Sequence, residues 1–192
     1  MPVSVRQIKP NDVASMEALS TMFGEAFGEV DTYTGNRPSA AYLQRLLDSD
    51  YFIALVAAKN DEIVGGIAAY ELRKFEQQRS EIYLYDLAVA EAHRREGIAT
   101  ALIAELRKVA AARGAYVIFV QADSAAGDQP AIGLYTRLGR REDVLHFDIP
   151  VHAVGATPNP TADVPQAVDA HTRPRADGEW SSRRPGPPAS AK

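Results

Sequence analysis

The sequence predicts an α/β domain in which helices flank a mixed central sheet. Segments with apolar residues at helical spacing alternate with short extended apolar runs along residues 3–149, and this alternation is typical of α/β domains. The chain has 192 residues, 46% of them hydrophobic, which suffices for one domain with a buried core. We expect the element order β-α-α-β-β-β-α-β-α-β, without an internal repeat.

The first half of the domain is predicted to contain three strands and two helices. Asn11 or Asp12 is expected to cap the first helix and Ser39 the second, because their side-chain oxygens can accept hydrogen bonds from helix N–H groups. The polar residues 59–61 predict a tight turn between two strands. In order, the elements are a strand over Val3–Ile8, a helix ending near Phe27, a helix from Ser39, and strands over Tyr51–Ala58 and Glu62–Leu72.

The second half is predicted to contain three strands and two helices. Gly114 is expected to end a long amphipathic helix, and Gly139 a shorter helix that Asp128 caps. The central strand–helix–strand unit predicts a right-handed parallel crossover. The strand after Gly114 is almost entirely apolar, so we expect it to be buried on both faces. In order, the elements are a strand over Glu81–Val89, a helix from Gly97 to about Arg113, a strand over Ala115–Gln121, a helix over Pro130–Leu138 and a strand over Asp143–Ile149.

Residues 151–192 differ from the rest of the chain in composition. They contain no Leu, Ile, Phe, Tyr or Met, and they hold seven of the twelve prolines. Such a segment cannot bury enough apolar surface to offset the entropy that it would lose on ordering. We therefore expect one folded domain over residues 1–150 and a disordered, Pro-rich C-terminal tail over residues 151–192. The tail is interpreted as a dispensable extension, with an interaction arm as the alternative.

Composition and charge narrow the function classes. The net charge is −4, and residues 1–150 hold 16 basic and 21 acidic side chains, so no nucleic-acid partner is expected. The absence of cysteine excludes disulfides and a cysteine nucleophile. The four histidines do not have metal-ligand spacing, so we expect no metal. No segment has the pattern of a signal peptide or membrane span, and the expected location is the cytoplasm, without a membrane partner.

The loop Arg94–Ala99, with the sequence Arg-Arg-Glu-Gly-Ile-Ala, lies between a predicted strand and a predicted helix. Backbone N–H groups at a helix start lack internal partners and carry the positive end of the helix dipole. Glycine lets the backbone approach a ligand, and arginine adds charge-assisted donors. The loop therefore predicts a pyrophosphate site. A dinucleotide fold is the main rival, but it needs Gly-x-Gly-x-x-Gly, and only Gly97 is present.

The spacing Arg-x-x-Gly-x-Ala also resembles the pyrophosphate loop of the GCN5-related N-acetyltransferases, which bind acetyl-CoA. Residues 3–149 resemble that fold throughout, and several segments resemble the class I aminoglycoside 3-N-acetyltransferases, the gentamicin-resistance enzymes. These segments are Lys74–Glu76, Ser80–Val89, His93–Ile103, Gly114–Asp123, Ala131–Gly139 and Val144–Ile149. The chain departs from the family motif at Arg140, where phenylalanine is common, and at Asp128, where asparagine is common.

The resemblance implies how acetyl-CoA is bound. The strand that ends at Val89 would separate from the strand that starts at Ala115, with the pantetheine arm in the gap. Backbone N–H groups at that strand end would hold the thioester carbonyl, where negative charge develops. Tyr135 would protonate the departing thiolate, with simple packing of its ring under the sheet as the alternative. The implied cofactor-binding residues are Leu87, Ala88, Val89, Arg94, Arg95, Glu96, Gly97, Ile98, Ala99 and Thr100.

A carboxylate must take a proton from the attacking amine, directly or through water. Asp86 is the first candidate, because an acidic residue in an apolar and aromatic strand is costly to bury without a partner. A solvated, outward-facing Asp86 is the alternative, and Asp123 is the second candidate base. Other acidic side chains would form a rim that attracts a polycationic substrate at a rate that salt reduces. The candidate substrate-binding residues are Asp86, Glu81, Glu71, Asp123 and Asp148.

Taken with the resemblance, these residues predict transfer of an acetyl group from acetyl-CoA to the 3-amino group of aminoglycosides. Direct attack in a ternary complex is expected, because no residue is a strong candidate for an acyl-enzyme nucleophile. The choice of nitrogen rests on the resemblance alone, as does a possible homodimer; the residues themselves predict only acetyl-CoA and a cationic amine. The alternatives are an acetyltransferase for polyamines or other small amines and a non-catalytic acyl-CoA-binding module.

Overall fold

The computed structural model describes residues 3–123, 128–147, 149 and 151. Contacts divide the chain into two units, Met1–Asp143 and Val144–Lys192, and the fold below is that of the first. Apart from Val151, the predicted tail lies outside the described residues. None of the described helices combines the length and the apolar character that crossing a membrane requires.

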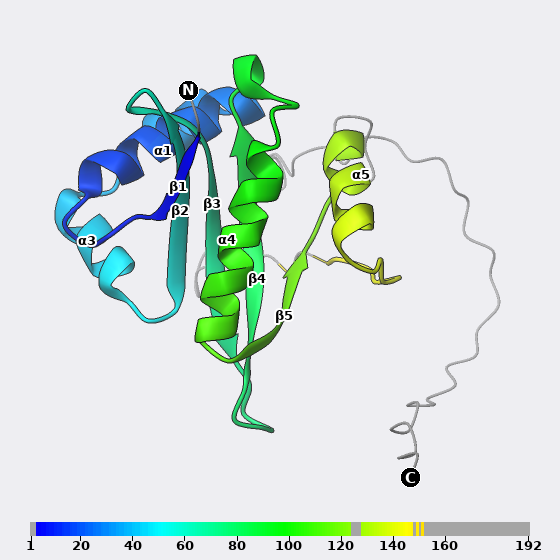
Figure 1. Cartoon of the computed structure of the whole chain (residues 1–192). Coiled ribbons are helices and arrows are strands. Elements are labelled where there is room, and N and C mark those ends of the chain that lie inside the picture. Colours follow the sequence, from blue (N-terminus) through cyan, green and yellow to red (C-terminus); the bar gives the residue numbers. More distant parts are fainter. Residues whose placement is uncertain (1–2, 124–127, 148, 150, 152–192) are drawn as a thin grey trace, which may run out of the picture. The chain divides into compact units, whose positions relative to one another are not determined.

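A five-stranded mixed sheet forms the centre of the first unit (Figure 1). Its strands follow one another in space in the order β1-β2-β3-β4-β5. The first three pairings are antiparallel, and β5 joins β4 in parallel after the α4 crossover. The strands are β1 (Ser4–Gln7), β2 (Phe52–Lys59), β3 (Glu62–Arg73), β4 (Ser80–Val89) and β5 (Ala115–Val120). This confirms the predicted α/β fold with a mixed central sheet.

Local sequence signals account for the helix starts and the hairpin. The Ser15 N–H donates to Asp12 Oδ1 at 3.2 Å, and the Tyr42 N–H donates to Ser39 Oγ at 3.3 Å, so both predicted caps are present. Asn60 and Asp61 have φ values of 52° and 64° and form the two-residue turn between β2 and β3. The helices are α1 (Val13–Phe27), α2 (Val30–Thr34), α3 (Ala40–Asp48), α4 (Ile98–Ala112) and α5 (Gln129–Leu138).

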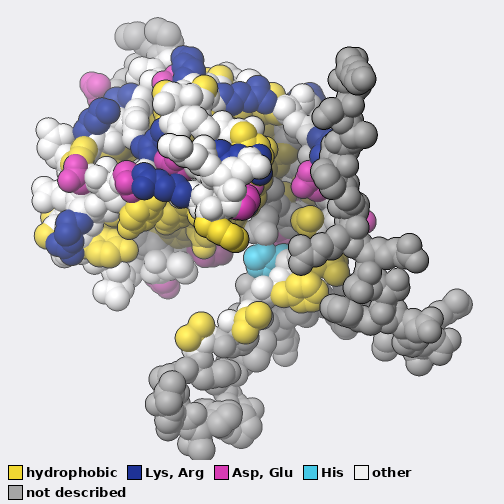
Figure 2. Space-filling model, turned by 90° about the horizontal axis from the view of Figure 1, so that it is seen from below, with side chains coloured by type: hydrophobic (Ala, Val, Ile, Leu, Met, Phe, Trp, Pro, Cys, Tyr) yellow, Lys and Arg dark blue, Asp and Glu magenta, His cyan; other side chains and the backbone are white. Residues whose placement is uncertain are grey.

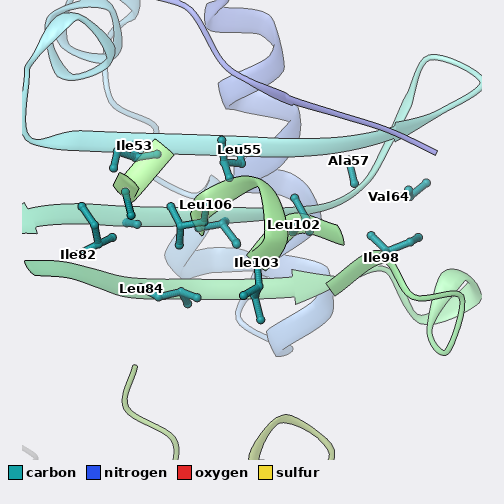
Figure 3. Packing of buried hydrophobic residues seen from close by; sticks show 13 residues of the cluster. Ile53, Leu55, Ala57, Val64, Ile82, Leu84, Ile98, Leu102, Ile103 and Leu106 are labelled. Carbon is teal, nitrogen blue, oxygen red and sulfur yellow. The ribbon is translucent and has the colours of Figure 1, made fainter. Parts of the chain in front are cut away.

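Each face of the sheet has its own apolar core. On one face, Leu102 and Leu106 of α4 are fully buried against Ile53 and Leu55 of β2 and their neighbours on β3 and β4 (Figure 3). On the other face, apolar side chains of α1 and α3 cover a second cluster. The helices of that second face contribute Leu19, Met22, Phe23 and Leu47. Burial on both faces is what holds the central strands in place.

The structure differs from the expected fold in four places. The short helix α2 was not predicted, because five residues carry too little periodicity to indicate a helix. The strand β5 is an edge strand, and Tyr116 and Val117 are 51% and 40% exposed. Asp128 is the N-cap residue of α5, as predicted, but its side chain makes no capping hydrogen bond and accepts from the Asp123 N–H instead, at 3.0 Å. Residues 143–147, the described continuous part of the last predicted strand, are not in a strand.

Candidate active site

The strands β4 and β5 diverge at the end of the sheet that carries the predicted site (Figure 1). Their parallel pairing ends where Leu84 lies opposite Val120, whereas β4 continues to Val89. Among the described residues, no strand therefore lies beside one edge of β4 along residues 85–89, and alternate backbone groups on that edge have no strand partner in the described sheet. An exposed backbone edge of this kind can donate hydrogen bonds to a ligand in the gap.

A β-bulge at Tyr85 decides where the next side chain points. Ala68 of β3 lies opposite Asp86, but its neighbour Ala69 lies opposite Leu84, so Tyr85 is the extra residue of β4. Leu84 faces the core under α4. With regular alternation Asp86 would face the same core. The bulge instead places Asp86 on the face covered by α1, where it lines a pocket together with Ala68.

Two pockets meet at Tyr85 and Asp86, which line both of them. The first, the helix-side pocket, has a volume of about 180 Å³ and lies between the helices α1 to α3 and the strands β2 to β4. Its other lining residues are Met16, Glu17, Ser20, Phe23, Tyr33, Arg37, Pro38, Tyr42, Leu43, Leu46, Phe52, Ala68 and Tyr70.

The second, the strand-gap pocket, has a volume of about 140 Å³ and lies where β4 and β5 diverge, beside α5. Its other lining residues are Phe27, Leu84, Leu87, Val120, Gln121, Ala122, Asp128, Ala131 and Tyr135. The carboxyl group of Asp86 thus belongs to the wall between two spaces that different parts of a reaction could occupy.

The surroundings of Asp86 favour a proton acceptor. Burial raises the pKa of the Asp86 carboxyl above its ordinary value, the hydrogen bond from Tyr33 opposes this shift, and the negative charge of Glu29 adds to it. Tyr33 Oη lies 3.4 Å from Asp86 Oδ1. A carboxylate with a raised pKa is a stronger base than one in water, so Asp86 is suited to take a proton from a bound amine.

Aromatic rings line the helix-side pocket and continue across the sheet. Tyr70 packs edge-on against Tyr85 at 5.7 Å between ring centroids, and Tyr83 packs edge-on against Tyr85 at 5.5 Å. Tyr83 also stacks on Phe119 of β5 at 4.8 Å. These rings surround the site with apolar faces and few charges. Asp86 and Glu17 are the carboxylates that line this pocket, and both could attract a bound amine.

The loop before α4 has the geometry of an anion site. Arg95 and Gly97 have φ values of 69° and 81°, and no side chain of the described residues caps the helix that begins at Ile98. A Cβ added at Gly97 would meet no atom within 4 Å. The space beside Gly97 is therefore open, and the positive end of the helix dipole lies at this helix start. This arrangement fits a pyrophosphate group.

Side-chain contacts hold this loop in place. Lys59 Nζ donates to Glu96 Oε2 at 3.0 Å, and His93 Nδ1 lies 3.3 Å from Glu96 Oε1. The hydrogen bonds from Lys59 and His93 lower the pKa of Glu96. Arg94 Nε donates to the carbonyl oxygen of Val89 at 3.3 Å, which ties the loop to the end of β4.

Tyr135 of α5 lies in the strand-gap pocket, and its half-buried ring packs against the core under α4. Burial raises the pKa of the Tyr135 hydroxyl to about 12, and the negative charge of Asp128 adds to the effect. The hydroxyl therefore stays protonated at every ordinary pH and can act as a hydrogen-bond donor in this pocket.

The structure does not bring all the sequence-predicted residues to the two pockets. Asp123 follows β5 and is exposed, but it does not line either pocket. Glu71 pairs with Arg113 at 2.9 Å, and Glu81 pairs with Lys74 at 3.4 Å; neither lines the helix-side pocket or the strand-gap pocket. On the face seen in Figure 2, acidic and basic side chains are interspersed. Asp148 lies outside the described residues, and no three described His, Asp or Glu residues form a metal-binding group.

Two residues of the site were missed by sequence reasoning. Tyr33 lies on the unpredicted helix α2, and Tyr85 is the bulged residue. Gly28, which ends α1 with a φ of 73°, indicates that the chain turns there. No comparable signal marks the bulge, because one inserted residue in an aromatic strand leaves the composition of that strand unchanged.

Comparisons with known proteins agree with this geometry. Residues 16–139 match the Acetyltransferase (GNAT) family. The chain belongs to that family. Enzymes of the GNAT family use acetyl-CoA, and the divergent strands and the uncapped α4 lie within the matched residues. Among curated proteins, no significant match to the chain was found.

Solved structures of GNAT proteins resemble this one. An aminoglycoside acetyltransferase from an uncultured soil metagenomic sample is 68% identical, with a TM-score of 0.78 over 79% of this chain and 100% of that one. A second such enzyme, also from an uncultured soil metagenomic sample and in complex with sisomicin, is 28% identical. Its TM-score is 0.70, and the match covers 78% of this chain and 97% of that one. A ribosomal-protein-alanine N-acetyltransferase from Brucella melitensis shares the fold. It is 22% identical, with a TM-score of 0.62, and the match covers 79% of this chain and 100% of that one.

Proposed function

We propose that this GNAT protein transfers the acetyl group of acetyl-CoA to the 3-amino group of aminoglycosides of the gentamicin class. The observation that carries the proposal is the position of Asp86 in the wall between the helix-side pocket and the strand-gap pocket. An amine bound in the helix-side pocket would meet a thioester bound in the strand-gap pocket, and Asp86 would lie where the two meet. The 68% identity to an aminoglycoside acetyltransferase supports the substrate class.

The residues of β4 and the α4 loop would hold acetyl-CoA, which supplies an activated acetyl group. The first-turn N–H groups of α4, together with Arg94 and Arg95, would bind the pyrophosphate. Backbone N–H groups along Leu87–Val89 would donate to the thioester oxygen as negative charge develops on it. These donors are fixed by the pairing of β4 with β3 before any ligand arrives, so little reorganisation is needed during the reaction.

Asp86 would accept a proton from the substrate amine. An ammonium group has no lone pair with which to attack a carbonyl carbon, so deprotonation must precede or accompany the attack. The ionised carboxyl group also favours binding of a cationic amine in an apolar pocket, where the attraction is screened less than in water. Direct attack then needs no acyl-enzyme, in keeping with the absence of cysteine from the chain.

Tyr135 would donate its hydroxyl hydrogen to the departing sulfur. A pKa of about 12 lies above the ordinary value of about 8.5 for a thiol, so complete transfer of the proton from tyrosine to a thiolate is uphill. A hydrogen bond to the sulfur while its charge develops does not have this cost. We therefore propose that Tyr135 stabilises the departing thiolate chiefly as a hydrogen-bond donor.

The size of the helix-side pocket fits one ring of a larger substrate. Its volume of about 180 Å³ is below the range of roughly 300–1,000 Å³ that is typical for sites enclosing a whole drug-sized ligand. The aromatic faces of Tyr70 and Tyr85 suit the apolar C–H faces of a sugar ring. In this proposal the ring that carries the reacting amine enters the pocket, and the remaining rings of the aminoglycoside lie outside.

Gly97→Asp is expected to weaken acetyl-CoA binding by at least about tenfold. The substitution places a negative charge beside the pyrophosphate, and it forces a side chain into a backbone conformation with a φ of 81°. Isothermal titration calorimetry with acetyl-CoA would measure the change. Gly114→Asp has a comparable backbone conformation, with a φ of 74°, at the opposite end of α4 and serves as the control for strain alone. Equal affinities of the wild type and Gly97→Asp would contradict the pyrophosphate assignment.

The substrate class is tested by acetylation of an amine panel. Release of the CoA thiol would be followed with acetyl-CoA and gentamicin, sisomicin, an aminoglycoside without a free 3-amino group, and spermidine. We expect kcat/KM to be at least about 100-fold higher for gentamicin than for spermidine, because the extra sugar rings contribute binding energy outside the pocket. Mass spectrometry and NMR of the product would identify the acetylated nitrogen.

Each alternative has its own result in this experiment. Comparable rates for spermidine and gentamicin would favour a small-amine acetyltransferase. Acetylation at another nitrogen would keep the substrate class and overturn the 3-amino assignment. Tight acetyl-CoA binding without thiol release from any amine would favour a non-catalytic acyl-CoA-binding module.

A further inference from the structure

The short helix α2 is fastened to α1, and it carries one side chain into the helix-side pocket. Ser20 Oγ of α1 donates to the carbonyl oxygen of Tyr33 at 2.8 Å. Gly24 of α1 makes room for this contact, since a Cβ there would lie 3.1 Å from Tyr33 Cβ and from Val30 Cα. The backbone of Tyr33 is therefore fixed against α1.

The ring of Tyr33 packs against two aromatic rings of α1. Its centroid lies 6.1 Å from that of Phe23, in an edge-on arrangement, and 5.8 Å from that of Phe27. The Tyr33 side chain is half-buried, and its hydroxyl group lies 3.4 Å from Asp86 Oδ1. Phe23 and Phe27 come from α1, whereas Asp86 comes from β4, so the ring bridges the helical layer and the sheet.

We propose that Tyr33 is a positioning residue for Asp86, whose hydroxyl group holds the carboxylate at the wall between the two pockets. This inference rests on the proposed role of Asp86 as the proton acceptor. A carboxyl group on a bulged strand beside open space has freedom to rotate, and one donor on a rigid ring restricts that freedom. The second carboxylate oxygen then remains available for the amine.

Charged and titratable groups other than the Tyr33 hydroxyl also lie around Asp86. Glu29, which precedes α2, is a nearby negative charge, and Tyr70, Tyr83 and Tyr85 approach from β3 and β4. Glu17, Arg37 and Tyr42 line the helix-side pocket from the helical layer, and Asp128 and Tyr135 line the strand-gap pocket. Arg37 donates to Thr21 Oγ1 at 2.7 Å and to the carbonyl oxygen of Glu17 at 3.4 Å.

The experiment compares the wild type with Tyr33→Phe, which keeps the ring and removes the donor. NMR titration of ¹³C-labelled Asp carboxyl groups, with the Asp86 signal assigned by its loss in Asp86→Asn, measures the pKa of Asp86 without any substrate. We expect a rise of about half a pH unit or more in Tyr33→Phe, because the hydrogen bond favours the ionised form. Glu29→Gln is expected to lower the pKa of Asp86, because it removes a negative charge.

Activity provides the second measurement. In Tyr33→Phe, the acidic limb of the pH profile of kcat/KM for the amine is expected to shift to higher pH, together with the pKa of Asp86. The KM for acetyl-CoA should stay the same. Tyr51→Phe also removes a tyrosine hydroxyl, but Tyr51 does not line either pocket, so its profile should match the wild type. A purely structural role would lower the melting temperature of Tyr33→Phe without moving the profile.

An unchanged Asp86 titration in Tyr33→Phe would overturn the proposal, whatever substrate the enzyme uses. A shifted titration supports it even if gentamicin is not acetylated, because the measurement needs only the free protein. Conversely, if Asp86→Asn abolishes acetylation of gentamicin while Tyr33→Phe behaves as the wild type in both measurements, the proposed function stands and the role of Tyr33 is wrong.

Discussion

Asp86→Asn is expected to lower kcat/KM for the amine substrate by about 10²- to 10⁴-fold, the usual contribution of a general base. Asparagine keeps the shape of the side chain but cannot accept a proton from the amine. The loss should shrink as pH rises, since more of the substrate amine is then deprotonated in solution. Thiol release at saturating acetyl-CoA, measured across pH, would show both effects.

Two further variants identify the base. Asp123→Asn changes the second candidate carboxyl group, which does not line either pocket, and it should have a much smaller effect than Asp86→Asn. Asp48→Asn, at the exposed end of α3, is the control for an amide substitution that is remote from the site. A larger loss in Asp123→Asn than in Asp86→Asn would transfer the role of base to Asp123.

The stability of Asp86→Asn separates a catalytic effect from unfolding. Burial holds the pKa of Asp86 above its ordinary value in the folded chain, so the folded protein binds this proton more tightly than the unfolded chain does. The stabilising contribution is therefore present at low pH and is lost as pH rises through the folded-state pKa. Asparagine carries no charge to bury, and the variant should melt at pH 7 no lower than the wild type.

Tyr135→Phe is expected to lower kcat by roughly 10- to 100-fold with little change in the KM for acetyl-CoA. A hydrogen bond to a charged group contributes about 1.5–3 kcal/mol, and each 1.36 kcal/mol corresponds to a factor of ten in rate. The interaction forms only while charge develops on the sulfur, so its loss affects kcat rather than ground-state binding. Steady-state kinetics with varied acetyl-CoA would measure both constants.

The pKa of about 12 for Tyr135 adds a constraint to this prediction. If the hydroxyl acts as a donor throughout, no basic limb from Tyr135 should appear in the kcat profile below about pH 10, because the group does not ionise there. Tyr51→Phe again serves as the matched control, outside both pockets. Normal turnover by Tyr135→Phe would leave packing of its ring as the remaining role for this side chain.

The parts of the fold that were predicted correctly are those with local signals. Asp12 and Ser39 cap helices because a short polar side chain meets the free N–H groups of the residues that follow. Asn60 and Asp61 turn the chain because both residues tolerate a positive φ. The loop around Gly97 combines a positive φ with a helix start, as expected from a glycine before an amphipathic segment, and the anion site itself stays a prediction.

The errors arose where distant segments decide the outcome. The apolar composition of β5 predicted burial on both faces, but β5 lies at the edge of the sheet, and composition alone does not reveal the order of strands. The Asp128 side chain had the right position for a cap, but it accepts a hydrogen bond from the Asp123 N–H, a competing partner that propensity does not reveal. Glu71 and Glu81 form ion pairs with Arg113 and Lys74, which the sequence did not reveal, and their role in substrate binding stays a prediction.

The sequence by itself determined most of the elements, because each depends on residues that are neighbours along the chain. It also predicted a pyrophosphate loop and Asp86 as a candidate base, and both stay predictions. Only the tertiary structure decided which way Asp86 faces. Side chains of a strand alternate between its two faces, so one extra residue at Tyr85 reverses every later position. That reversal moves Asp86 out of the core under α4 and into the wall between the pockets, within reach of Tyr33.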